Sequence, residues 1–160
     1  MALAIIVGGE ARAAPDGKNV PRVAFFGFQL TNSSPEQTRP DEIARIRLLD
    51  DLFREKLDAS NRFTIVAIPA EIGREVATGP AIGSCNGCER DFARRIGATL
   101  AAWGTVRKVS NLILHINVYM VDAEAGKMEF VRGVSIRGNT DESWRRGLDY
   151  LLRNYLLGEP

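Results

Sequence analysis

This chain of 160 residues contains little histidine and cysteine, and its charges nearly balance. It has one histidine and two cysteines, and its 21 basic and 20 acidic side chains leave a formal charge of +1 at pH 7. So small a charge gives no electrostatic footprint for nucleic acid. A serine or cysteine triad would have to converge on His115, and no nucleophile motif or glycine-rich phosphate loop is present. We therefore expect no nucleic-acid partner, no cofactor and no catalytic triad.

Long hydrophobic runs are missing as well. No stretch after residue 14 approaches the 18 or so consecutive apolar residues that a membrane span needs. Near the start, the short apolar run 2–7 is followed by Ala11-Arg12-Ala13, which fits the small-x-small rule for signal-peptidase cleavage. We expect residues 1–14 to be the remnant of a secretory signal peptide whose true start lies upstream. The alternative is a frayed first strand or helix.

Export would place the protein in the periplasm. No cysteine follows the expected cleavage site, which argues against a lipoprotein anchor. Residues 15–19 are polar turn formers and are expected to be a linker. Residues 20–160 are then expected to form a single domain.

Hydrophobic periodicity predicts how this domain is built. Residues 20–30 are apolar on both alternating faces, as in a central strand, and 41–60 repeat every three or four residues, as in an amphipathic helix that Asp41 caps. The remaining patterns predict strands from 62 and over 98–109, 111–122 and 128–138, and helices from 69, after the cysteines and over 139–157. Parallel crossovers followed by an antiparallel meander predict an α/β (α+β) sandwich, in which helices cover a mixed sheet of about five strands. The expected core includes Ile43, Leu112 and Tyr155.

Cys85 and Cys88 stand two residues apart, just before a helical pattern. This spacing permits a structural disulfide, a redox dithiol or half of a tetrahedral metal site. A metal site is disfavoured because His115 is the only histidine that could complete it. Glu89 and Asp91, in the first turn of the helix, oppose the thiolate that redox catalysis requires. A structural disulfide, formed in an oxidising compartment, is the leading interpretation.

Residues 31–40 consist of loop formers and are long for a plain connection. Loops of this kind are often functional, although a merely flexible surface loop is the alternative. We expect this loop and the cysteine loop to present a partner-binding surface made of Thr31, Asn32, Ser33, Ser34, Asn86 and Gly87.

Four further features lie between residues 22 and 127: the cysteine pair, the step Gly97-Ala98, the hairpin motif W-G-x-V-x-K-V-S-N-L-I-L from Trp103 to Leu114, and the turn of Asp122 with Gly126-Lys127. In these features much of this part of the chain resembles a family of uncharacterised bacterial periplasmic proteins. More distantly, the order of elements is similar to the amino-terminal domain of TolB and to the periplasmic domains of the curli-export lipoprotein and of penicillin-binding-protein activators.

This resemblance implies an α/β sandwich that binds other envelope proteins and carries no catalysis. It also links the family with an accessory role in periplasmic quinoprotein alcohol oxidation. We therefore expect a non-catalytic periplasmic module that docks another envelope protein. The alternative is a periplasmic thiol-disulfide oxidoreductase with Cys85 as nucleophile and Cys88 as resolving thiol.

Overall fold

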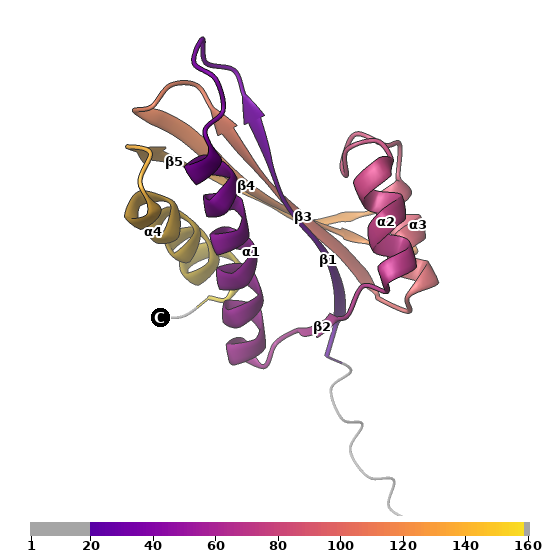
Figure 1. The fold of residues 1–160 in the computed structure, drawn as a ribbon. Helices are drawn as coiled ribbons and strands as arrows, with labels where there is room; N and C mark the ends of the chain where they lie inside the picture. Colours follow the sequence, from indigo (N-terminus) through magenta and orange to yellow (C-terminus); the bar gives the residue numbers. More distant parts are fainter. Residues whose placement is uncertain (1–19, 159–160) are drawn as a thin grey trace, which may run out of the picture.

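A computed structural model describes residues 20–158 of the chain. The predicted signal-peptide remnant and linker lie outside the described residues. Within residues 20–158, one five-stranded sheet lies between two helical layers of unequal size (Figure 1). The predicted fold class and the predicted order of elements are confirmed.

The sheet is mixed, with the strand order β2-β1-β3-β4-β5. Both β2 and β3 run parallel to β1, and β4 and β5 return as an antiparallel meander. The strands are β1 (Arg22–Asn32), β2 (Thr64–Val66), β3 (Leu100–Lys108), β4 (Ile113–Asp122) and β5 (Met128–Arg137). The helices are α1 (Pro40–Ser60), α2 (Ala70–Thr78), α3 (Cys88–Arg95) and α4 (Asp141–Leu151), which continues into the π-helical turn η1 (Leu152–Leu156).

The two faces of the sheet are covered differently. α1 and α4 pack against one face and enclose the larger core, which includes Phe25, Phe53 and Trp144, all fully buried. α2 and α3 lie on the other face, over the half of the sheet where β1 and β3 begin (Figure 1). The core there is rich in alanine, which lets the helical layer approach the sheet closely. The strand pattern of residues 20–30 thus predicted correctly a central strand buried on both sides.

A β-bulge in β1 is held by a side chain of α1. The register against β3 shifts between Phe25 and Phe28, where Gly27 has a φ of 86° that favours glycine. The backbone N–H of Phe28 donates to Asp50 Oδ1 at 2.7 Å. Burial raises the pKa of Asp50, and this hydrogen bond works in the opposite direction.

Three apolar residues predicted for the core are exposed. Ile43 is 48% exposed, because Glu42 and Arg45 occupy the buried positions in the first turns of α1. Leu112 is 71% exposed, because β4 begins one residue later and Leu112 lies in the preceding turn. Tyr155 is 49% exposed in η1, where the π-helical turn departs from the spacing of the α-helical stripe.

The start of α1 also differs from the prediction. Asp41 is not the N-cap: Arg39 holds that position, and Pro40 is the first helical residue. Proline suits this place because its missing N–H would have no partner in the helix. Across residues 20–158, no helix is both long and apolar enough to cross a membrane.

Gly104 in β3 is expected to tolerate no side chain. A Cβ there would lie 2.1 Å from the ring of Phe28, whereas a Cβ at Gly73 in α2 would meet nothing within 4 Å. Gly104→Ala should lower the free energy of unfolding by about 1–3 kcal/mol through overpacking. Gly73→Ala should leave it equal or raise it by up to about 1 kcal/mol, because alanine favours the helix. Urea unfolding of both variants measures the difference, and equal midpoints would contradict the packing assigned to Phe28.

Candidate functional site

One end of the molecule carries the loop between β1 and α1 beside the hairpin that joins β3 and β4 (Figure 1). We call residues 33–39 and 109–112 the loop-end surface. The backbone N–H of Ser33 donates to the carbonyl of Lys108 at 2.8 Å, and the Asn111 side-chain amide donates to the Glu36 carboxylate. The loop is therefore attached to the hairpin at two points.

Asn32, the last residue of β1, fastens the loop from inside. Its Nδ2 donates to the carbonyl of Glu36 at 2.6 Å, and its Oδ1 accepts from the backbone N–H of Ser34 at 3.0 Å. The Ser34 hydroxyl donates to the same oxygen at 2.6 Å. These bonds use the polar atoms of Asn32 for the shape of the loop.

A buried ion pair lies directly beneath the loop-end surface. Lys108 Nζ is 2.7 Å from Glu42 Oε1, and both side chains are fully buried. Glu42 also accepts from Asn139 Nδ2 at 2.6 Å and from the backbone N–H of Arg39 at 2.9 Å. Burial alone would raise the pKa of Glu42, but the bonds from Lys108, Arg39 and Asn139 outweigh it and lower the pKa.

The network continues to the start of α4. Asn139 Oδ1 accepts from Trp144 Nε1 at 2.9 Å and from Arg45 at 3.2 Å. Arg45 also pairs with Asp141 at 2.7 Å and with Asp41 at 2.8 Å. Hydrogen bonding to Arg39, with support from Arg45, lowers the pKa of Asp41 to about 2. Within residues 20–158, every buried side-chain nitrogen and oxygen has a hydrogen-bond partner.

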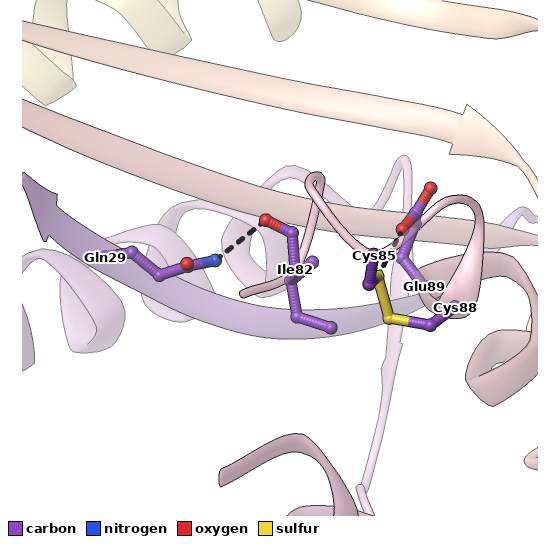
Figure 2. Close-up of a disulfide and its surroundings, with 5 residues drawn as sticks. All are labelled: Gln29, Ile82, Cys85, Cys88 and Glu89. Atoms are coloured by element: carbon purple, nitrogen blue, oxygen red, sulfur yellow. Dashed lines mark hydrogen bonds between the residues drawn. A yellow bond between two sulfur atoms is a disulfide. The ribbon is translucent and has the colours of Figure 1, made fainter. Parts of the chain in front are cut away.

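The cysteine pair forms a disulfide at the start of α3, with the two Cα atoms 5.5 Å apart. The loop before it lies against β1, where Gln29 Nε2 donates to the carbonyl of Ile82 at 3.1 Å (Figure 2). Asn86 and Gly87 both have positive φ, which closes the short ring between the cysteines. The disulfide therefore orders a loop that the side chain of Gln29 attaches to the sheet.

Glu89 lies beside the disulfide. Its Oε2 is 3.2 Å from Cys85 Sγ, and the side chain is almost fully buried (Figure 2). A carboxylate at this distance disfavours a thiolate at Cys85. Cys85, Cys88 and Glu89 place three potential metal ligands within 4.8 Å of one another. Metal sites use thiolates, however, and both sulfurs are already bonded to each other.

His115 lies on the face of the sheet opposite α1 and α4, where Nδ1 is 2.8 Å from the Ser135 hydroxyl of β5. The sequence did not reveal this serine, because the pairing depends on the register of two strands. No hydrogen bond or ion pair joins His115 to a carboxylate among the described residues. A catalytic triad thus lacks its third member in this part of the chain.

The structure places the predicted partner-binding residues at two locations. Thr31, Asn32, Ser33 and Ser34 lie at or next to the loop-end surface, whereas Asn86 and Gly87 lie in the cysteine loop. No hydrogen bond joins these two groups within residues 20–158. Sequence reasoning missed Glu42, Lys108 and Asn139, and the one available signal was a lysine at an inward position of β3.

Fold and geometry together define a small α/β sandwich with one rigidly held loop end. The chain belongs to the DUF3280 family, described as "Protein of unknown function (DUF2380)", which it matches over residues 21–156. This confirms the resemblance to an uncharacterised family. No curated protein matches the sequence.

Solved structures share the fold at low sequence identity. Lipoprotein GNA1162 from Neisseria meningitidis has a TM-score of 0.54 and 13% identity, covering 87% of this chain and 98% of its own. The PelC dodecamer from Paraburkholderia phytofirmans has a TM-score of 0.52 and 13% identity, and the match covers 82% of this chain and 84% of the PelC chain. The C-terminal domain of LpoB from Salmonella enterica has a TM-score of 0.51 and 12% identity, and the match covers 78% of this chain and 87% of the LpoB chain. These likenesses establish the fold and leave the function to the site.

Removing one partner of the buried pair should be costly. Lys108→Met would leave the Glu42 carboxylate buried without its cation, which should lower the free energy of unfolding by about 3–5 kcal/mol. The double variant Glu42→Leu with Lys108→Met should recover at least half of that loss. Lys127→Met removes an exposed pair with Glu129 and should change the stability by at most about 1 kcal/mol. Urea unfolding tests this series, and a loss at Lys108 no larger than at Lys127 would contradict it.

Proposed function

We propose that this chain is a non-catalytic binding module that docks another protein of the bacterial envelope through the loop-end surface. The observation that carries the proposal is a rigid exposed tip. Leu112 is 71% exposed on a hairpin whose strand end is held by the buried pair of Lys108 and Glu42. In the proposed interface Leu112 would be the apolar anchor, and the polar side chains around it would form the rim.

Preorganisation supports the same proposal. The loop 33–39 is bonded to the hairpin, and its own backbone is fixed by Asn32. A partner would therefore meet a surface whose order is already established, which reduces the conformational entropy lost on binding. Ile43, one turn into α1 and 48% exposed, adds a second apolar contact at the same end of the molecule.

The finer parts of the proposal concern location and partner. We place the protein in the periplasm, exported by the segment over residues 1–14. GNA1162, which shares the fold, is described as a lipoprotein, and the sequence resemblance points to the envelope. A periplasmic quinoprotein alcohol dehydrogenase is the first partner to test, with this chain as its accessory.

The oxidoreductase alternative is less well supported. The carboxylate of Glu89 at 3.2 Å from Cys85 Sγ disfavours the thiolate that would have to attack a substrate disulfide. The ring closed by the two cysteines is small, so the bond contributes about 2 kcal/mol in the chain-entropy estimate. We assign it the role of fixing the cysteine loop.

Capture of the partner should depend on Leu112. Leu112→Asp should reduce recovery of a cross-linked partner from a periplasmic extract at least tenfold, because a buried charge would replace an apolar anchor. Met128→Asp is the matched control, since Met128 is 44% exposed at the opposite end of the sheet. Purified quinoprotein alcohol dehydrogenase is tested in parallel. Equal recovery with both variants, or no partner under several growth conditions, would count against the docking surface.

The disulfide should be hard to reduce. We expect its reduction potential to lie below about −300 mV, outside the range of roughly −270 to −120 mV that spans catalytic dithiols. Glu89→Gln should raise the potential, because it removes the charge that opposes a thiolate. Redox titration against glutathione or dithiothreitol measures both values. A wild-type potential within the catalytic range would favour the oxidoreductase instead.

A further inference from the structure

The half of the sheet that α2 and α3 leave uncovered carries cationic and polar side chains in strand register. Arg107 of β3 pairs with His115 of β4, which pairs with Ser135 of β5. The next row joins Thr105, Asn117 and Gly133 in the same way. We call these six residues the cationic face.

A hollow of about 420 Å³ lies over this face. It is lined by Arg107, His115, Asn117, Gly133, Val134 and Ser135. Gly133 keeps the hollow open and Asn117 in place, since a Cβ at this position would lie 2.1 Å from Asn117 Oδ1. A glycine inside a strand is typical of a place where another group approaches the backbone closely.

The charges on this face are unbalanced, although the chain as a whole is nearly neutral. The cationic face holds an arginine and the only histidine of the chain, and none of its six residues is acidic. Arg137 adds a further cation on β5, two residues beyond Ser135. A negative ligand therefore meets no repulsion from the side chains that line the hollow.

Arg107 has its donors available. Its side chain is exposed, and no hydrogen bond or ion pair joins its guanidinium to another of residues 20–158. His115 uses Nδ1 toward the Ser135 hydroxyl, which leaves Nε2 for a ligand. Asn117 donates through Nδ2 to Thr105 at 3.3 Å, a bond long enough to be exchanged for a better acceptor.

We propose that this hollow binds a small molecule through an oxyanion group, a carboxylate or a phosphate. The Arg107 guanidinium would hold two oxygens at once, since its planar fork matches both groups. In the tautomer in which the Ser135 hydroxyl donates to Nδ1, His115 Nε2 carries the ring proton and would donate to the same oxyanion. The inference goes beyond partner docking and holds whether or not the loop-end surface binds a protein.

The single histidine makes the test direct. Acetate, succinate and inorganic phosphate are titrated into the full chain at constant ionic strength, and the His115 ring signals are followed by NMR. We expect saturable shifts with at least one probe, and the stronger of the carboxylate and phosphate arms identifies the group. Chloride at the same ionic strength should give no saturation.

Arg107→Gln should weaken this binding at least fivefold, whereas Arg107→Lys, which keeps the charge without the fork, should weaken it less. Arg132→Gln is the matched control. Arg132 is exposed on β5, but as the neighbour of Gly133 it lies on the opposite face of the sheet from the hollow. Both cations lie at the surface, so the variants should fold, which circular dichroism verifies. The proposal is overturned by shifts that never saturate, by equal affinities in the Arg107 and Arg132 variants, or by binding of an acidic peptide when none of the small anions binds.

Discussion

The ion pair between Lys108 and Glu42 is the constraint on which the loop end of this molecule depends. Two buried charges are tolerated only when they face each other and their remaining atoms are hydrogen-bonded. Glu42 meets that condition through Lys108 of β3, the backbone of Arg39 and the side chain of Asn139. The end of β3, the start of α1 and the start of α4 must therefore come together, and their meeting point sets the position of the loop and the hairpin.

Neighbouring cations of β3 serve opposite faces of the sheet. Lys108 points inward to Glu42, and Arg107 lies on the face that α2 and α3 leave uncovered. The alternation of a strand requires this division. The buried pair thereby fixes the strand that carries Arg107. The cysteine loop is held on the same face of the sheet as Arg107, because Gln29 attaches it to β1 at the edge of the alanine-rich core. The loop-end surface and the cationic face therefore lie next to each other, because both are built at the end of β3.

Periodic burial made most of the fold predictable from the sequence. β1 is apolar on both faces and α1 has a stripe through Leu49, Phe53 and Leu57, and both were predicted with nearly correct bounds. The polar network was not predictable, because Glu42 and Lys108 are 66 residues apart and each alone looks like a solvated charge. The burial of Leu112 was predicted wrongly. Its position matches the alternation of the buried side chains of β4, but the strand begins only at Ile113 and Leu112 lies in the turn before it. Ser135 became visible only with the register of β4 and β5.

Order at the loop end opposes a large entropic cost. Fixing the backbone of a loop costs conformational entropy, and contacts that hold the loop offset part of that cost. The bonds of Asn32, Ser33 and Asn111 hold residues 33–39, and the buried network beneath fixes the end of β3 and the start of α1 on either side of them. The rigid exposed Leu112 beside it is consistent with a surface formed in advance for a partner, so that binding does not have to order it.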